Sequence, residues 1–196
     1  VLFLAAFVVL RRRAFGLFAA VREPVMLAFA TASSEAAYPK TLAMLERFGC
    51  SNRIASFVLP LGYSFNLDGS MMYCTFAVMF IAQVYGIELS VAQQITMLLI
   101  LMVTSKGMAG VPRASLVVIA ATLAQFDIPE PGLLLLLGVD HFLDMARSAT
   151  NVIGNSIATA VVAKWEGELG PVRGADQEEM LEPPQEPPLL PQLQTA

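Results

Sequence analysis

The chain has 196 residues, of which 56% are hydrophobic and 14% are charged, and its mean hydropathy is +0.64. Soluble domains carry about 25% charged residues, so this composition argues against a soluble enzyme and for a protein that crosses a membrane several times. The net charge of −4 and the lack of an extended basic face argue against nucleic-acid binding. Cys50, Cys74 and the lone histidine, His141, have no metal-site spacing, so no metal centre or organic cofactor is expected.

The first apolar run, residues 1–10, is too short to span a bilayer. It lacks the charged start and the small-residue cleavage site of a signal peptide. Residues 1–13 are therefore interpreted as the end of a truncated transmembrane helix and its basic loop, which would make the chain the C-terminal part of a longer protein.

The next segment, residues 14–48, has basic residues on both flanks. Arg11, Arg12 and Arg13 precede the segment around residues 15–32, and Lys40, Arg47 and Arg53 lie beyond its polar interruption at residues 31–35. Lys and Arg favour the cytoplasmic side of short loops. A segment that enters and leaves on one side is a re-entrant hairpin, which is tolerated where its tip lines protein or a water-filled cavity.

Residues 52–85 are apolar but become polar at residues 64–70. One straight helix of about 30 residues would be longer than the hydrocarbon core is thick. We therefore predict a crossing helix that unwinds near residues 66–69. The following loop, residues 86–90, contains no Lys or Arg, as an external loop should.

The second half of the chain repeats this plan in the opposite orientation. A hairpin over residues 90–126 is interrupted at residues 104–113, and a final helix over residues 131–165 crosses back to Lys164. This predicts an all-α membrane protein with an inverted repeat of re-entrant hairpin and broken helix, a transporter architecture. The acidic, proline-rich residues 167–196 have no apolar period and are predicted to be disordered.

A stripe of polar residues marks the final helix. Its members recur at helical spacing and share one face: Asp140, Asp144, Arg147, Ser148, Asn151 and Asn155. A charged residue at the bilayer centre costs roughly 2.5–3.5 kcal/mol, so this face must turn to a polar cavity. Alone, Asp144 and Arg147 are also compatible with a simple intramembrane ion pair. Together with the other polar interruptions, they predict a solute pathway.

The residue types indicate the chemistry of the solute. Arg147 can fork onto a carboxylate and Asp144 can accept from an ammonium, while helices that begin near residues 31–35 and 107–112 would aim N–H groups at an anion. Asn66 and Asp68 offer oxygens to a hard cation. These features predict an anionic or zwitterionic solute with a coupled cation. Covalent catalysis is not indicated, because no Ser, Cys or Lys has a base beside it. Lys106 fits a snorkelling anchor as well as a site residue.

Four motifs resemble the dicarboxylate/amino acid:cation symporter family over roughly residues 1–166. They are Ser33-Ser34-Glu35, the run from Gly62 to Ser70, the run from Ser105 to Pro112, and the run from Asp144 through Arg147 and Asn151 to Asn155. The resemblance implies a glutamate-transporter-like transport domain over residues 14–166, which moves as an elevator against N-terminal scaffold helices missing from this chain. It further implies a homotrimer of multi-pass subunits in the inner membrane.

The resemblance also implies residue roles. Ser34 and Val111 would contact the substrate through backbone groups, Arg147 would hold its side-chain carboxylate, Asp144 its ammonium and Asn151 its α-carboxylate. The implied substrate site comprises Ser33, Ser34, Gly110, Val111, Pro112, Asp144, Arg147, Ser148 and Asn151. The implied cation site comprises Gly62, Asn66, Asp68, Asn151 and Asn155, with sodium at the first four.

Several positions depart from the family pattern. Asn155 stands where sodium-coupled members typically have Asp, and Leu67 stands where many members have Met. The bacterial proton-coupled glutamate carriers also show Asn and Leu at these two positions, so the chain resembles them more closely. Asp144 separates the chain from the C4-dicarboxylate carriers, which commonly lack that acid, and Arg113 has no assigned role. We predict a symporter for glutamate or aspartate driven by protons, sodium or both. The alternatives are a carrier of succinate, fumarate or malate, and a non-transporting fragment that associates with other membrane subunits.

Overall fold

The computed structural model describes residues 2–105 and 114–172 of the chain. Apart from short connections, these residues are helical. In chain order the elements are α1 (Leu2–Leu10), α2 (Arg13–Thr31), α3 (Tyr38–Phe48), α4 (Asn52–Phe65), α5 (Asp68–Val84), α6 (Val91–Thr104), α7 (Ala114–Gln125), the 3₁₀ turn η2 (Glu130–Gly132), α8 (Leu133–Leu137) and α9 (Asp140–Trp165).

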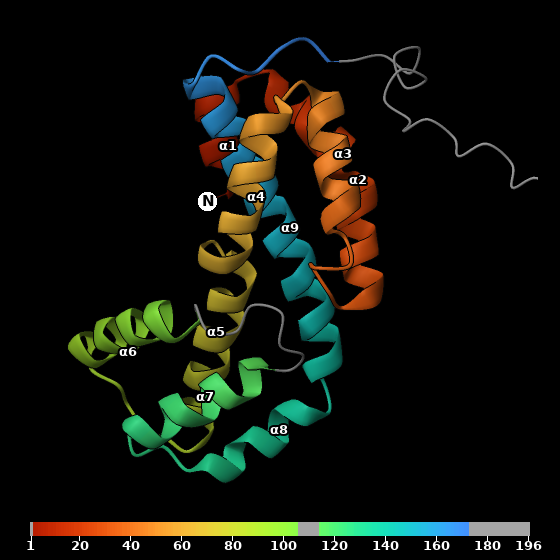
Figure 1. Ribbon diagram of the computed structural model, residues 1–196. Helices are drawn as coiled ribbons and strands as arrows, with labels where there is room; N and C mark the ends of the chain where they lie inside the picture. Colours follow the sequence, from red (N-terminus) through yellow and green to blue (C-terminus); the bar gives the residue numbers. More distant parts are fainter. Residues whose placement is uncertain (1, 106–113, 173–196) are drawn as a thin grey trace, which may run out of the picture.

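Helix α9 is the central element and lies between α2 and α3 on one side and α4 and α5 on the other (Figure 1). Its second half buries small side chains, among them Ser156, Thr159, Ala160 and Ala163, which allow neighbouring helices to approach closely. The hydroxyls of Ser156 and Thr159 donate to backbone oxygens one turn earlier, at 2.7 and 2.8 Å. Their burial is therefore compatible with an apolar setting.

The connections at the two ends of α3 follow from local backbone chemistry. Helix α2 ends at Thr31, and the next residue, Ala32, turns the chain with φ of 50°; α3 ends at Phe48 and is followed by Gly49 with φ of 110°. Glycine is favoured there because it has no Cβ to clash in the left-handed region. Ser51 then caps α4 by accepting from the Ile54 N–H at 3.3 Å.

The long apolar stretch in the middle of the chain is interrupted. Helix α4 ends at Phe65 and α5 begins at Asp68, and the residues between them, Asn66 and Leu67, have non-helical φ, ψ angles of −115°, 65° and −97°, 62°. The interruption lies within the polar run from which unwinding is predicted. It leaves the first N–H groups of α5 without partners in their own helix.

The buried core has two main parts, one on each side of this interruption. The first joins α1 to α4 with the second half of α9, around Phe48 and Leu59. The second joins α5 to α8, around Ile81 and Leu101. A third, small group of Ala28, Ala37 and Val152 lies where the α2–α3 connection meets α9.

The final segment is divided rather than continuous. The sequence predicts one helix over residues 131–165, whereas the structure separates it into η2, α8 and α9. The chain turns at Gly138 and Val139, where Val139 has φ of −119° and ψ of −9°. Glycine weakens a helix, and the turn places Asp140 in the first turn of α9, where the helix dipole favours a carboxylate. The predicted single helix is thus corrected to two helices.

Residues 167–172, here called the closing segment, fold back over the end of the molecule where α2 and α4 begin (Figure 1). Leu169 forms an isolated β-bridge with Cys50, and the Gly170 N–H donates to the Gly49 carbonyl at 2.8 Å. The sequence prediction assigned these residues to a disordered tail, but the structure places them against the packed helices. Residues 173–196 lie outside the described part of the chain.

Side chains add to the attachment of the closing segment. The Arg13 guanidinium donates to the carbonyls of Leu169 at 3.4 Å and Gly170 at 2.6 Å. The Glu168 carboxylate pairs with Arg53 and accepts from the Ser51 hydroxyl. The segment therefore holds together the start of α2, the α3–α4 connection and the start of α4.

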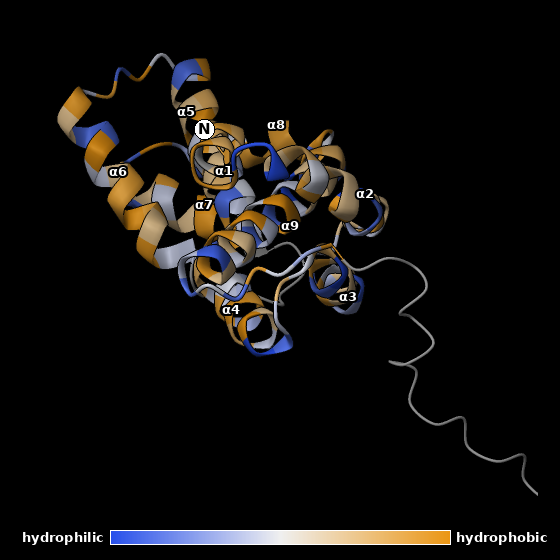
Figure 2. Cartoon of the chain, turned by 90° about the horizontal axis from the view of Figure 1, so that it is seen from above, coloured by the Kyte–Doolittle hydropathy of each residue, from blue (hydrophilic) through white to orange (hydrophobic). Residues whose placement is uncertain are grey.

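The outer surface is strongly apolar. Two stretches, Arg13–Thr31 and Asn52–Val84, are long and apolar enough to cross a membrane. Large apolar side chains point outward along several helices, for example Phe57 (68% exposed), Phe76 (71%) and Val103 (70%), and Figure 2 shows apolar residues along α6. A surface of this kind suits contact with lipid or with further helices better than contact with water.

Candidate functional site

Asn151 of α9 caps the N-terminus of another helix, α5. Its Oδ1 accepts from the Gly69 N–H at 2.9 Å and from the Ser70 N–H at 3.4 Å. These are first-turn groups of α5, which has no side-chain cap of its own. One side chain 1% exposed therefore fixes the start of α5 on the middle of α9.

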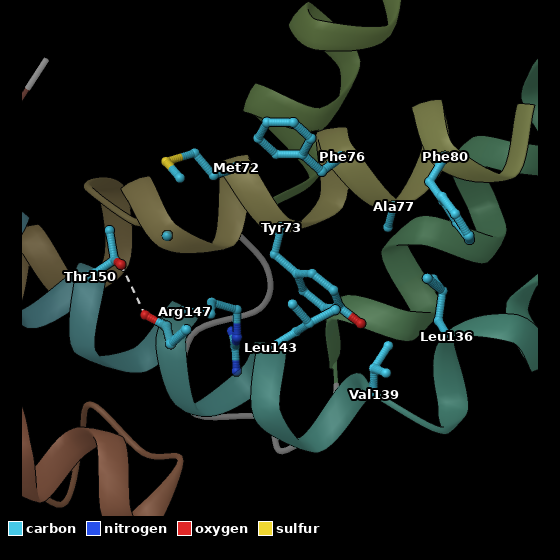
Figure 3. Close-up of a pocket in the computed structure, with 12 residues that line it drawn as sticks. Met72, Tyr73, Phe76, Ala77, Phe80, Leu136, Val139, Leu143, Arg147 and Thr150 are labelled. Atoms are coloured by element: carbon cyan, nitrogen blue, oxygen red, sulfur yellow. Dashed lines mark hydrogen bonds between the residues drawn. The ribbon is translucent and has the colours of Figure 1, made fainter. Parts of the chain in front are cut away.

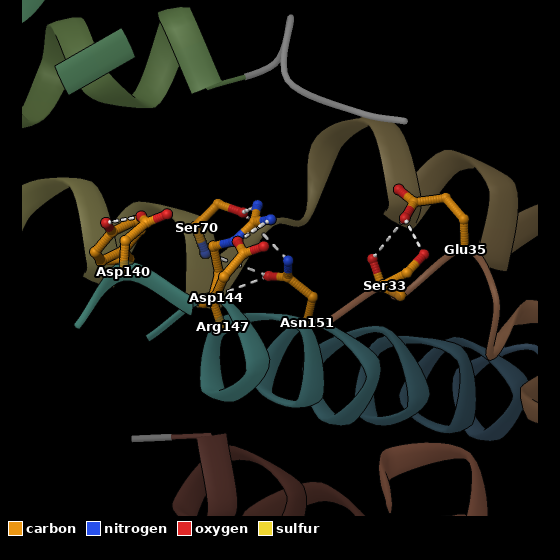
Figure 4. Close-up of polar contacts among 10 residues, drawn as sticks. Ser33, Glu35, Ser70, Asp140, Asp144, Arg147 and Asn151 are labelled. Carbon is orange, nitrogen blue, oxygen red and sulfur yellow. Dashed lines mark hydrogen bonds and ion pairs between the residues drawn. The ribbon is translucent and has the colours of Figure 1, made fainter. Parts of the chain in front are cut away.

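Ser70 joins the two polar residues that project from α9. The Ser70 Oγ accepts from Asn151 Nδ2 at 3.2 Å and from Arg147 Nη1 at 3.1 Å. Arg147 also donates from Nε to Asp144 Oδ1 at 2.7 Å, and its Nη2 lies 2.5 Å from the same oxygen. The side chains of Arg147 and Asp144 are only 12% and 14% exposed. Figure 4 shows this group as one continuous polar network.

The α2–α3 connection brings a second polar group to α9. The hydroxyls of Ser33 and Ser34 donate to Glu35 Oε2 at 3.2 and 3.4 Å, and Ser33 Oγ accepts from the Ala36 N–H at 3.2 Å. The connection packs on Val152, the residue that follows Asn151. Figure 4 accordingly shows Ser33 and Glu35 on the same side of α9 as Asn151.

An oxygen-rich cluster lies where α4 ends. The Asn66 amide nitrogen is 3.2 Å from Asn155 Oδ1, and the opposite amide orientation directs it to both carboxylate oxygens of Asp68 at 3.3 Å. Close packing depends on two glycines, because a Cβ on Gly62 would lie 2.5 Å from Asn155 Oδ1 and one on Gly154 would lie 2.2 Å from Asp68 Oδ2. The cluster is thus built from α4, α5 and α9 together.

One polar atom of this cluster is unsatisfied. Asn155 is 1% exposed, and its Nδ2 has no hydrogen-bond partner among the described residues. An unsatisfied buried polar group costs about 1–3 kcal/mol. A polar ligand that reached this amide would therefore be bound favourably.

Asp140 and Ser148, the remaining members of the α9 stripe, are both buried. Asp140 accepts from the Tyr73 hydroxyl, which ties α9 to the middle of α5. It does not contact Arg147 by any hydrogen bond within the described ranges. Asp140 therefore lies on the same helix as Arg147 and Asn151 but outside the hydrogen-bonded network that they form with Ser70.

A hollow of about 410 Å³ adjoins the network (Figure 3). Gly69 and Arg147 are among the residues that line it, but most of its lining is apolar and comes from α5, α8 and α9, including Phe76, Phe80 and Leu136. Such a lining does not suit an acidic solute. The candidate site for a charged ligand is instead the polar network beside it.

The structure brings together predicted residues that are far apart in the chain. Asp144, Arg147, Ser148 and Asn151 lie on α9, with Ser33 and Ser34 at the nearby connection, while Gly62, Asn66, Asp68 and Asn155 form the oxygen cluster. The predicted residues Gly110, Val111 and Pro112 lie outside the described part of the chain, as do Lys106 and Arg113.

Sequence reasoning left out Ser70 and Gly154 as site residues. Ser70 follows the Asn66–Gly69 run directly and is 0% exposed, so its place in a polar interruption was an available signal. Gly154 stands between Ile153 and Asn155 on α9, and only the crossing with Asp68 shows why a side chain is excluded there.

The known proteins that this chain resembles are membrane transport proteins. A proton/sodium-glutamate symport protein of Bacillus caldotenax is 54% identical over 154 residues, which are 79% of this chain and 37% of that protein. A proton/glutamate-aspartate symporter of Escherichia coli is 53% identical over 146 residues, 74% of this chain and 33% of that protein. A C4-dicarboxylate transport protein of Laribacter hongkongensis is 49% identical over 150 residues, 76% of this chain and 34% of that protein.

The chain thus spans about a third of the length of these curated relatives. The sequence pattern of one family matches residues 1–165, which include every helix from α1 to α9. The chain belongs to the sodium:dicarboxylate symporter family, a family of membrane transporters rather than enzymes.

Proposed function

We propose that the intact gene product imports glutamate or aspartate together with protons, sodium or both. The observation that carries this proposal is the pair formed by Arg147 and Asp144. These opposite charges lie one helical turn apart on α9 and are largely buried. Arg147 can donate two parallel N–H bonds to a carboxylate, and Asp144 can accept from an ammonium, so side by side they provide both groups that an acidic amino acid requires.

In the described arrangement the two charges neutralise each other, with Arg147 donating to Asp144 and to Ser70. An acidic amino acid would replace this one ion pair with two. Its side-chain carboxylate would pair with Arg147, and its ammonium would pair with Asp144. Asn151 Nδ2 carries a second N–H besides the one given to Ser70, and this N–H would meet the α-carboxylate. Ser33, Ser34 and Ser148 would complete the site, and the family resemblance adds Gly110, Val111 and Pro112, which lie outside the described residues.

The coupling cation would bind at the oxygen cluster. Gly62 and Asn66 at the end of α4, Asp68 at the start of α5, and Asn151 and Asn155 on α9 supply carbonyl, amide and carboxylate oxygens. Asn155 contributes an amide rather than a carboxylate, so the cluster carries one negative charge less than it would with Asp at that position. This favours protons over sodium as the main coupling ion.

The order of the helices supports the remaining parts of the proposal. In this proposal, α2–α3 and α6–α7 are re-entrant hairpins that enter the inner membrane from opposite sides. The pairs α4–α5 and α8–α9 are the broken helices that cross it. The domain of residues 14–166 would move as an elevator against scaffold helices within a homotrimer. The exposed apolar faces of α4, α5 and α6 suit contact with such helices and with lipid.

Transport of C4-dicarboxylates is the second candidate. It is favoured by the name of the Laribacter hongkongensis relative and its 49% identity. Asp144 argues against it, because succinate has no ammonium to balance this carboxylate in a buried site.

Uptake of labelled glutamate by the intact gene product in proteoliposomes tests these alternatives. We expect uptake under an inward proton gradient without sodium, blocked more strongly by unlabelled aspartate than by succinate. Uptake that requires sodium would overturn the coupling preference while retaining the substrate. Stronger block by succinate would identify a dicarboxylate carrier, and no uptake under either gradient would support a non-transporting protein.

A further inference from the structure

We infer that Tyr63, on α4, is a positioning residue that holds the Ser34 end of the substrate site in place. Its hydroxyl donates to the Ser34 carbonyl at 2.9 Å, across 29 residues of sequence. This inference rests on the proposed function, because it concerns how the proposed substrate site is held. Tyr63 was not among the residues that the sequence motifs assign to substrate or cation.

The first step is that the α2–α3 connection is held at the Ser34 carbonyl both by its own backbone and by α4. The connection, residues 32–37, is closed internally by short-range bonds such as the Ala37 N–H donating to the Ser34 carbonyl at 3.1 Å. Thr31, just before the connection, and Glu35, within it, are exposed, whereas Ser34 is 4% exposed. The buried side of the connection therefore faces α4 and α9, and on that side the Tyr63 hydroxyl donates to the Ser34 carbonyl.

The second step is that Tyr63 is itself held rigidly. It is 8% exposed, and its ring packs edge-to-face against Tyr38 of α3, with ring centroids 5.4 Å apart and planes at 82°. Edge-to-face pairs fix the orientation of both rings. The hydroxyl thus has little freedom to leave the Ser34 carbonyl while α3 and α4 remain packed.

The third step concerns the neighbour of Tyr63 in sequence. Gly62 packs against the Asn155 side chain so closely that a Cβ would lie 2.5 Å from its Oδ1. The adjacent residues Gly62 and Tyr63 therefore touch the oxygen cluster and the α2–α3 connection respectively. A shift of the last turn of α4 on cation binding would be passed to Ser34 through the Tyr63 hydroxyl.

The test removes this hydroxyl alone. Tyr63→Phe keeps the ring and its contact with Tyr38, and the matched control Tyr38→Phe removes a hydroxyl that makes no hydrogen bond within the described residues. In proteoliposomes with the intact gene product, Tyr63→Phe should raise the KM for glutamate about fivefold, the factor that one ordinary hydrogen bond is worth. The maximal rate should change less than twofold, and Tyr38→Phe should match the wild type.

A second measurement does not depend on transport. Hydrogen exchange of the backbone amides of residues 32–37 in nanodiscs should become faster in Tyr63→Phe and stay unchanged in Tyr38→Phe. Unchanged exchange in Tyr63→Phe, or an equal KM in Tyr63→Phe and the wild type, would overturn the inference. If the wild type takes up neither glutamate nor succinate, the proposed function and the substrate part of this inference fail together, while the exchange experiment still decides whether Tyr63 holds the connection.

Discussion

Individual side chains in the polar network serve two helices at once. Asn151 caps α5 through its Oδ1 and contacts Ser70 through its Nδ2, so replacing it would loosen α5 as well as alter a ligand contact. Asp144 differs, because its ion-pair partner, Arg147, lies on the same helix. A substitution at Asp144 therefore reports on ligand chemistry more directly than one at Asn151.

Replacing Asp144 with Ser should separate amino acids from dicarboxylates. The variant removes the acceptor proposed for an ammonium, and hydrogen bonds to charged groups are worth about 1.5–3 kcal/mol. The kcat/KM for glutamate should therefore fall at least about tenfold, while that for succinate changes less. Competitive uptake of the two labelled substrates measures the ratio. Glu88→Gln, at an exposed loop acid, serves as the control, and a larger loss for succinate would refute the ammonium assignment.

At the scale of helices, the site depends on a close crossing of α5 and α9. A Cβ on Gly69 would lie 2.3 Å from the Arg147 carbonyl oxygen and 3.0 Å from Thr150 Cβ. The first of these is a backbone atom, so neither helix can relieve the clash by turning a side chain. The crossing in turn places Ser70 between Arg147 and Asn151.

Gly69→Ala should therefore destabilise the protein by separating α5 from α9. Overpacking of this kind costs typically about 1–3 kcal/mol, and the thermal unfolding temperature in detergent should fall by several degrees. Gly16→Ala is the matched control, because its Cβ would lie 3.6 Å from Phe48 Cε2, an ordinary contact. Equal unfolding temperatures for the two variants would show that the crossing is looser than described.

The sequence was sufficient to predict features that depend on neighbouring residues. The polar run around Asn66 stands out within an apolar stretch, and the spacing of Asp144, Arg147 and Asn151 defines a helix face. Contacts between distant segments could not be predicted, since Asn66 and Asn155 are 89 residues apart. Tyr63 reads in sequence as an ordinary aromatic residue of an apolar helix, and the turn at Gly138 follows an unbroken run of leucines.

At the scale of the whole molecule, the closing segment joins elements from both ends of the described chain. It has no apolar period that would identify it in sequence, because its contacts use mainly backbone groups, Arg13 and Glu168. Its attachment covers the end of the molecule at which α2 and α4 begin. Removal of the closing segment should therefore destabilise this end of the molecule.

A protein that ends at a stop codon after residue 172 serves as the reference, and one that ends after residue 166 should unfold at a lower temperature than this reference. The second truncation removes the acceptors of the Arg13 guanidinium and the partner of Arg53. Thermal unfolding of both purified proteins provides the measurement. An unfolding temperature of the shorter protein equal to that of the reference would mean that the closing segment adds no stability.

Cys50 provides a chemical probe of the same contacts. Burial raises the pKa of the Cys50 thiol to about 11, although the nearby Arg13 guanidinium acts in the opposite direction. Since the thiolate is the reactive form, maleimide labelling should be slow at neutral pH and rise about tenfold per pH unit below that pKa. Mass spectrometry of a Cys74→Ala variant would measure it. Truncation after residue 166 should expose Cys50 and speed labelling at neutral pH, and equally slow labelling would contradict this account.

The closing segment also constrains the order in which the protein folds. The hydrogen bond between Arg13 and Gly170 joins residues 157 positions apart, and contacts of such long range form late. On the ribosome, α2 and α4 are synthesised well before residues 168–170, which pack over the first turns of both helices. Until translation reaches that point, the Arg13 guanidinium and the Cys50 thiol remain open to solvent, so a stalled or prematurely terminated chain would present this unsealed end to quality-control proteases.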